Sequence, residues 1–370
     1  MRTLSTNVAL AVLLIASPVA GQTNQTPSDQ SIIRPYQMLV LGDSISWGQG
    51  LKKEGKSWYQ VKIWLEKSTG RVVTEKIAAH SGAVIERSSV TDGYTSTNPE
   101  VNVALPTLHE EIDNALRFYS DGSQVDLVLV SACGNDVGIV NLLNASSAGE
   151  IDRMTEQKCG APVERLLRRI ATSFPAARVI LTGYYPFFSE QTRMDFIVKA
   201  MVRRFFKTTA AVPQLSSREV FERLTANSRH WYEGSNKTLA EAVRKVNAEA
   251  GGKQRVMFAR IDFPPDHSFE APQTRLWGFN RSPFRMALLL LSFGKVIVPT
   301  NDEVRGPRTA SCDQAFTEQP NETAAQKKER KGRRMFCRYA SLGHPNRKGA
   351  LLYADAITNL LQTTTAVNTR

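Results

Sequence analysis

The 370-residue sequence predicts an α/β protein with a three-layer, doubly wound and mainly parallel sheet that carries loop and helix insertions. Short apolar segments alternate along the chain with longer amphipathic ones, which is typical of repeated strand–helix–strand units. Each apolar segment is nearly continuous, as expected for strands that are covered on both faces of a parallel sheet. The length suits one large domain, which we expect at 35–365.

The alternating segments give the expected elements in order. The strands are predicted at 37–42, 71–78, 125–132, 178–183 and 255–261. The helices are predicted at 57–68, 105–119, 161–174, 237–250 and 346–362. In the third helix, Leu166, Leu167 and Ile170 recur at helical spacing on one side. Two stretches, 186–236 and 263–343, have no such pattern and are expected to be irregular insertions that shape a substrate rim.

The first 21 residues have the composition of a secretory signal peptide. Arg2 supplies a positive start, residues 8–16 are apolar, and small residues follow Pro18. Residues 22–34 then form a polar linker. No other stretch approaches the roughly 18 apolar residues of a membrane-spanning helix. We therefore expect a soluble protein that is secreted or periplasmic, without stable membrane insertion.

Export makes disulfides possible between the cysteines at 133, 159, 312 and 337. Four cysteines allow three connectivities, and the sequence does not choose among them. Pairing of Cys133 with Cys159 and of Cys312 with Cys337 closes the shortest loops and is the pairing we favour. The alternative for Cys133 is a buried thiol in an apolar strand. No cysteine or histidine spacing indicates a zinc site.

The net charge of +12 is partly concentrated in the basic run at 327–334. Such a run can bind nucleic acid or an anionic surface. It lacks interleaved aromatic residues, and no nucleic-acid-binding module surrounds it. We therefore expect a solvated loop and no nucleic-acid partner.

The residues that follow the predicted strands point to chemistry, because ligands of open parallel sheets bind at the carboxyl ends of the strands. Ser44 follows the first strand, Gly82 the second and Asn135 the third, while His344 precedes the last helix. Together they offer a hydroxyl, a backbone N–H without a neighbouring Cβ, an amide and an imidazole. Acyl transfer needs a nucleophile, a base and donors for the oxyanion.

In this order, the motifs Gly42-Asp43-Ser44, Gly134-Asn135-Asp136 and His344-Pro345-Asn346 resemble the SGNH, or GDSL-type, esterase and lipase family over residues 36–362. The resemblance implies the flavodoxin-like SGNH hydrolase fold, Ser44 as nucleophile and His344 as base. It also implies that Gly82 and Asn135 bind the oxyanion and that neither a metal nor an organic cofactor is needed. No G-x-S-x-G motif of an α/β-hydrolase occurs.

Two positions depart from the family pattern. Cys133 stands where a glycine is usual, and Ser341 stands where the family carries an aspartate three residues before the histidine. A backbone carbonyl near Ser341 could accept the Nδ1–H of His344, which we favour, because Pro345 restricts the backbone there. Otherwise a carboxylate must come from elsewhere, with Asp313 and Asp355 nearest in sequence.

The function expected from these residues is hydrolysis of a carboxylic ester, of a small molecule or a lipid, through an acyl-enzyme on Ser44. Trp277, Phe279 and the apolar stretch 284–298 could line an acyl pocket or belong to the core, and the stretch favours longer acyl chains. Two alternatives remain open. One is a carbohydrate O-acetyl esterase of the same family, and the other is an exported binding protein without catalysis.

Overall fold

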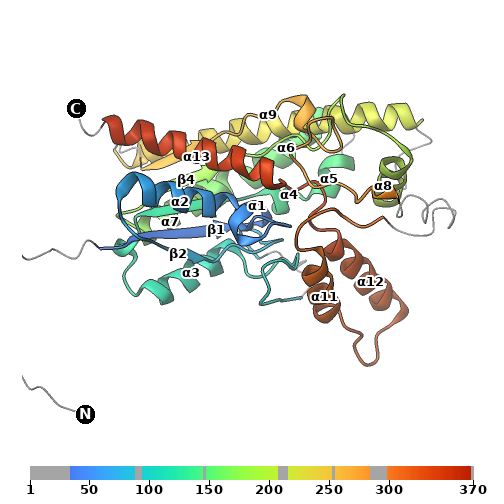
Figure 1. Ribbon diagram of the computed structural model, residues 1–370, viewed down its shortest axis with the longest axis horizontal. Helices are drawn as coiled ribbons and strands as arrows, with labels where there is room; N and C mark the ends of the chain where they lie inside the picture. The colour runs from blue at the N-terminus through green and yellow to red at the C-terminus, as the bar shows by residue number, and fades with distance from the viewer. Residues whose placement is uncertain are drawn as a thin grey trace, which may run out of the picture. The chain divides into compact units, whose positions relative to one another are not determined.

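The computed structural model describes residues 34–87, 94–144, 147–206, 216–251, 255–283 and 298–367. Its centre is a parallel five-stranded sheet in the order β2-β1-β3-β4-β5 (Figure 1). The strands are β1 (Tyr36–Gly42), β2 (Val73–Ile77), β3 (Leu127–Ser131), β4 (Arg178–Thr182) and β5 (Val256–Ala259). The predicted doubly wound parallel sheet is confirmed.

Helices cover both faces of the sheet. Alternate strand residues point to opposite sides, and since they are apolar on both sides, both faces are packed against helices. Leu39, Val128 and Leu181 pack on one side against α3 (Leu108–Tyr119), α6 (Ala148–Cys159), α7 (Ala161–Ser173) and α9 (Ser217–Glu249). Met38 and Ile180 pack on the other side against α2 (Ser57–Thr69) and α13 (Arg347–Val367). The result is the predicted three-layer arrangement, with β1, β3 and β4 buried on both faces and the edge strand β2 buried only at Val73.

The first predicted insertion contains more regular structure than its sequence suggests. Helix α8 (Phe196–Phe206) lies within it, and α9 runs from Ser217 through the helix predicted at 237–250. The expectation of an irregular segment up to residue 236 is therefore wrong. The polar residues that obscured the pattern are buried and bonded, since Asn236 donates to Tyr184 O (3.1 Å) and Ser235 to Trp231 O (2.6 Å). Hydrogen bonding offsets part of the cost of burying them.

The second insertion also contains helices, α11 (Arg305–Ala315) and α12 (Ala324–Arg338), which lie side by side beyond the carboxyl ends of the strands (Figure 1). The basic run is part of α12, so the expectation of a loop is wrong. Thr323 and Gln326 form a capping box that starts the helix. Arg330 is buried against Glu322, with Nε 2.7 Å from a carboxylate oxygen, while Lys327, Lys328 and Lys331 are exposed.

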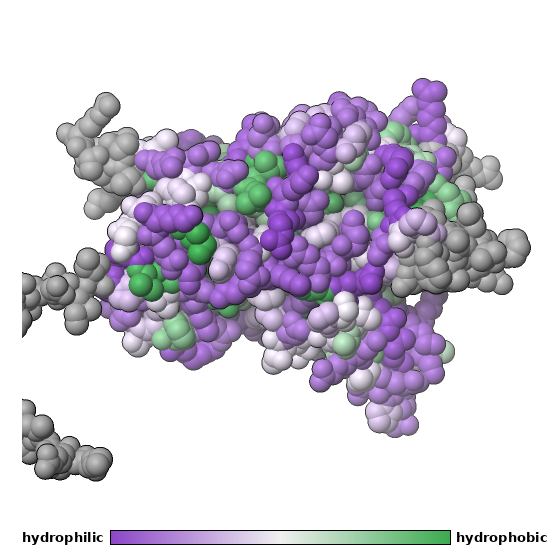
Figure 2. Space-filling view, in the orientation of Figure 1, coloured by the Kyte–Doolittle hydropathy of each residue, from purple (hydrophilic) through white to green (hydrophobic). Residues whose placement is uncertain are grey.

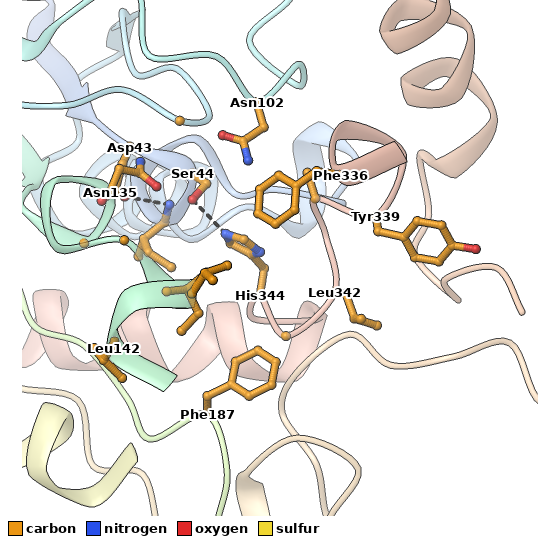
Figure 3. A pocket seen from close by; sticks show the side chains of 18 of the residues that line it. Asp43, Ser44, Asn102, Asn135, Leu142, Phe187, Phe336, Tyr339, Leu342 and His344 are labelled. Carbon is orange, nitrogen blue, oxygen red and sulfur yellow. Dashed lines mark hydrogen bonds between the residues drawn. The ribbon is translucent and has the colours of Figure 1, made fainter. Parts of the chain in front are cut away.

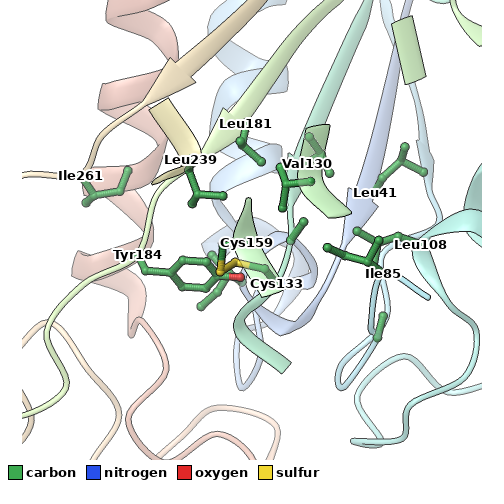
Figure 4. Packing of buried hydrophobic residues seen from close by; sticks show 14 of the residues in the cluster. Leu41, Ile85, Leu108, Val130, Cys133, Cys159, Leu181, Tyr184, Leu239 and Ile261 are labelled. Atoms are coloured by element: carbon green, nitrogen blue, oxygen red, sulfur yellow. A yellow bond between two sulfur atoms is a disulfide. The ribbon is translucent and has the colours of Figure 1, made fainter. Parts of the chain in front are cut away.

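Both favoured disulfides are formed. Cys312 and Cys337 join α11 to α12, and Cys133 and Cys159 join the end of β3 to the end of α6. Figure 4 shows the second of these beside Tyr184, below Val130 and Leu181. Both cysteines are buried in the main core. The bond thus ties the loop that precedes Asn135 to a helix on the sheet.

On the face drawn in Figure 2 the surface is mostly polar, and apolar residues form only scattered patches. Within the described ranges, no helix is long and apolar enough to span a membrane. The signal peptide and all but the last residue of the polar linker lie outside those ranges, so both remain predictions. The same holds for residues 284–297 of the apolar stretch.

Three short helices lie near the carboxyl ends of the strands. They are α1 (Ser44–Trp47), α4 (Gly134–Val137) and α5 (Ile139–Asn144). The first two begin directly after β1 and β3, which are hydrogen-bonded neighbours in the sheet. Their first residues are consequently brought to one place, as the strand order requires.

Candidate active site

Ser44 is the first residue of α1 and stands at the end of β1. The strand ends at Gly42, whose φ of +116° suits only glycine, and a Cβ there would lie 2.3 Å from Ser131 O. Asp43 then caps α1 by accepting the Ile45 N–H at 2.9 Å. This tight turn leaves Ser44 buried at the wall of a cavity.

Asp43 is fully buried and fixes the turn by further hydrogen bonds. It accepts the Ser131 hydroxyl at 2.6 Å and the Tyr184 hydroxyl at 2.8 Å. Burial raises the pKa of Asp43, although these hydrogen bonds partly offset the rise. The Tyr184 oxygen also accepts the Gly134 N–H at 2.8 Å. One tyrosine therefore links the turn that holds Ser44 to the helix that holds Asn135.

His344 reaches Ser44 from the loop before α13, with Nε2 2.7 Å from the Ser44 Oγ (Figure 3). Its backbone is clamped by Trp277, whose N–H donates to His344 O at 2.7 Å and whose carbonyl accepts the Gly343 N–H at 2.8 Å. Burial lowers the pKa of His344 to about 4, and the charge of Arg308 contributes. The imidazole is therefore neutral near pH 7, and Nε2 can accept the serine proton.

The third member of a triad is not found where the sequence suggested. Among the described residues, His344 Nδ1 has no hydrogen-bond partner, so the favoured backbone carbonyl does not accept from it. The carbonyls of Ser341, Leu342 and Ala340 raise the pKa of the imidazole, against the larger effect of burial. Asp313 is paired with Arg338 at 2.5 Å, and Asp355 is exposed on α13. Neither carboxylate is bonded to the histidine.

Gly82 and Asn135 line the same cavity as Ser44 and His344. Gly82 has φ +85°, and a Cβ on it would lie 2.3 Å from Asn102 Oδ1. Asn135 donates its Nδ2 to Ala83 O at 2.9 Å, which holds the Gly82 loop beside α4. Among the described residues, the backbone N–H groups of Ser44 and Gly82 have no protein acceptor. They are thus available to a ligand.

The loop that carries Gly82 is further held by Asp136, which accepts the Ile85 N–H at 3.1 Å. Burial raises the pKa of Asp136 to about 7, and the nearby Asp43 adds to the rise. Cys133, at the usual glycine position, adopts φ +86° and precedes α4. The conformation typical of glycine is thus kept by a cysteine, which the disulfide to Cys159 anchors.

The cavity beside Ser44 has a volume of about 430 Å³ and is mainly apolar. Sequence reasoning did not identify most of its walls, which come from α5, α8, α9, α12 and the segment after β4. The apolar side chains are Ile139, Val140, Leu142, Phe187, Phe188, Met201, Trp231, Phe336 and Leu342. Figure 3 shows Phe336 and Asn102 on one side of His344 and Phe187 and Leu142 on the other. Trp277 and Phe279 instead belong to the buried packing.

Asn102 is one of the polar residues of this cavity that sequence reasoning did not identify. Its side chain lies near Ser44 in Figure 3. It follows no predicted strand, so the rule that polar residues gather at strand ends did not reveal it. No group of histidines, cysteines and carboxylates that could hold a metal ion occurs in the described ranges.

The family model described as GDSL-like Lipase/Acylhydrolase matches residues 38–357. The chain belongs to this family, and the resemblance noted in the sequence is confirmed. The family comparison thus defines the class of the protein as an enzyme that hydrolyses carboxylic esters. No curated protein is similar enough to count as a match.

Among solved structures, similar folds include an extracellular lipase from Streptomyces rimosus, with 17% identity, a TM-score of 0.39 and coverage of 65% of this chain and 87% of that one. Phospholipase A1 from Streptomyces albidoflavus NA297 has 14% identity and a TM-score of 0.39, covering 67% and 89%. A family 3 carbohydrate esterase from Clostridium thermocellum has 15% identity and a TM-score of 0.32, covering 61% and 78%.

Proposed function

We propose that the protein is an exported serine esterase in which Ser44 is the nucleophile and His344 the general base. The observation that carries the proposal is the 2.7 Å separation of His344 Nε2 and Ser44 Oγ at the wall of an apolar cavity. A hydroxyl becomes a useful nucleophile when a neighbouring base can take its proton. The signal peptide predicted from the sequence and the two disulfides support export.

In the reaction, His344 takes the Ser44 proton as the serine oxygen attacks the ester carbonyl carbon. The carbonyl oxygen becomes an oxyanion, which the N–H groups of Ser44 and Gly82 and the Asn135 amide stabilise. The imidazolium then gives its proton to the departing alcohol. Water attacks the acyl-enzyme with His344 again as base, and the carboxylic acid leaves with Ser44 restored.

We infer that the substrate is an ester with an acyl chain longer than acetyl, such as a lipid ester. Leu142, Phe187 and Phe336 surround the space beside Ser44 with apolar side chains. Each buried methylene contributes about 0.8 kcal/mol, so a chain that fills this space should bind more tightly than acetate. A carbohydrate O-acetyl esterase would not need such a cavity.

The test has two parts. A fluorophosphonate probe should label the wild-type protein at Ser44 and leave the Ser44→Ala variant unlabelled. Rates on p-nitrophenyl esters from acetate to decanoate should rise with chain length. Activity on acetate alone would favour the O-acetyl esterase, and a complete lack of labelling of folded protein would favour the non-catalytic binding protein.

A further inference from the structure

Ser341 occupies the position three residues before His344, and its hydroxyl contacts a carboxylate. The side chain is fully buried, and Oγ donates to Asp302 Oδ2 at 2.7 Å. The Ser341 carbonyl accepts the His344 N–H at 2.9 Å, which closes the turn that presents the imidazole. The residue that bonds Asp302 is thus the same residue that bonds the backbone of His344.

Asp302 is held on every side within the core. Its side chain has no exposed surface, and Arg308, also without exposed surface, binds it with Nη2 2.6 Å from Oδ2 and Nη1 2.9 Å from Oδ1. The Thr300 hydroxyl and the Val304 N–H donate to it as well. Arg308 and these hydrogen bonds outweigh burial and lower the pKa of Asp302, so the group is a carboxylate.

The same network extends to the helix that begins with Ser44. Arg308 also pairs with the buried Glu100, with Nη1 3.0 Å from Oε1. Glu100 in turn accepts the Trp47 indole N–H at 2.6 Å and the Gly50 N–H at 2.8 Å. Trp47 is the last residue of α1. A chain of buried polar contacts therefore runs from the turn of His344 to the helix of the nucleophile.

We propose that Asp302 positions His344 through the Ser341 hydroxyl and that this indirect contact replaces the aspartate that the family carries at position 341. The inference rests on the proposed function of Ser44 and His344. Asp302 does not bond the imidazole ring, so it is a positioning residue. Because a buried hydrogen bond to a charged group is strong and directional, it can hold the turn in one arrangement.

The network also affects the protonation of His344, which a contact that only held the turn in place would not do. The charge of Arg308 disfavours the imidazolium form of His344. The carboxylate of Asp302 lies against the same guanidinium and offsets that charge. A carboxylate at position 341, three residues before the histidine, would act on the imidazole more directly. The pH profile of the reaction therefore distinguishes the direct arrangement from the indirect one.

The experiment compares the rate of fluorophosphonate labelling and kcat/KM for Ser341→Ala, Asp302→Asn and the double variant S341D/D302N, from acidic to neutral pH. Loss of the outer partners that orient a metal-binding histidine costs about 10–100-fold, and by analogy both single variants should slow by that factor. The loss should be in kcat, with KM little changed. Asp313→Asn is the matched control, since this aspartate also pairs with an arginine but lies outside the network.

The double variant restores a carboxylate at the position usual in the family and removes its buried neighbour. It should recover much of the rate lost in Asp302→Asn and move the acidic limb of kcat/KM to a higher pH than in the wild type. Failure of the folded double variant to exceed Asp302→Asn, with an unmoved limb, would overturn the inference.

Folding and function are separated by the remaining comparisons. Asp302→Asn weakens a buried ion pair and can unfold the protein, whereas Ser341→Ala keeps that pair, and circular dichroism reports which variants fold. Wild-type protein that is not labelled would defeat the proposed function itself. Wild-type protein that is labelled, with folded Ser341→Ala reacting equally fast, would defeat only the role of Asp302.

Discussion

Replacing Asn135 by alanine should lower kcat by about 10²–10³ and leave KM nearly unchanged, because an oxyanion donor acts mainly in the transition state. The amide carries two N–H bonds. One is used by Ala83 O at 2.9 Å, which leaves the other for the oxyanion. The loss in kcat corresponds to about 2.7–4 kcal/mol of transition-state stabilisation.

The same change should cost little stability. Only the hydrogen bond to Ala83 O is removed from the folded protein, and one such bond contributes about 0.5–1.5 kcal/mol. The expected fall in the melting temperature is therefore small, about 2–4 °C or less for a chain of this size. The large effect on kcat and the small effect on unfolding distinguish a donor from a residue that merely supports the loop.

The assay is steady-state hydrolysis of a p-nitrophenyl ester together with thermal unfolding. Asn141→Ala is the matched control, since this amide also borders the cavity but donates to Val137 O within the adjoining turn. It should change kcat by less than threefold, which is about 0.6 kcal/mol. A folded Asn135→Ala enzyme with a kcat within threefold of the wild type would refute the role of the amide.

Other perturbations test the surroundings of the site. The acidic limb of kcat/KM should lie near pH 4, because burial lowers the pKa of His344 to about 4 and the base acts only when neutral; a limb near pH 6.5 would contradict this. Glu111→Gln should become more stable relative to the wild type as pH rises from 5 to 8 in urea unfolding. Burial raises the pKa of Glu111 well above its usual value, so the folded state keeps a proton that the unfolded chain loses above about pH 4.5. Glutamine can still accept the Gly42 N–H, which now donates to Glu111 at 2.7 Å. An equal difference in unfolding free energy between variant and wild type at both pH values would contradict the raised pKa. Removing the disulfide with C312A/C337A should cost about 3 kcal/mol in unfolding and raise KM for long-chain esters, since α12 contributes Phe336 to the cavity; an unchanged KM would argue against a role of α12 in binding.

Local patterns were sufficient for the fold class and for much of the candidate site. Strands buried on both faces are apolar throughout, so β1, β3 and β4 were predicted to within two residues. Ser44 and Asn135 could be placed together because β1 and β3 end at the same edge of a parallel sheet. These inferences depend only on periodicity and on a general property of parallel sheets.

Local patterns gave wrong predictions where polar residues, which are usually exposed, are buried. Asn236 in α9 and Arg330 in α12 are polar residues that we assigned to irregular or solvated segments, yet both are buried and bonded. Their partners, Tyr184 and Glu322, are chosen by packing. A prediction from hydrophobic periodicity treats such residues as exposed, so the predicted helix is too short or is missed.

By itself, then, the sequence determined the layered fold, the family and four residues that meet at one cavity, because each depends on neighbours in the chain or on strand ends. Only the tertiary structure decided what surrounds them. Asp302 is 42 positions from His344 in the printed sequence. Asn102 and Phe336, which line the cavity, come from segments that are not strands of the sheet. A carboxylate acts on whatever lies within a few ångströms of it, and that distance is set by how separate segments pack and by which buried charges, such as Arg308, must be paired.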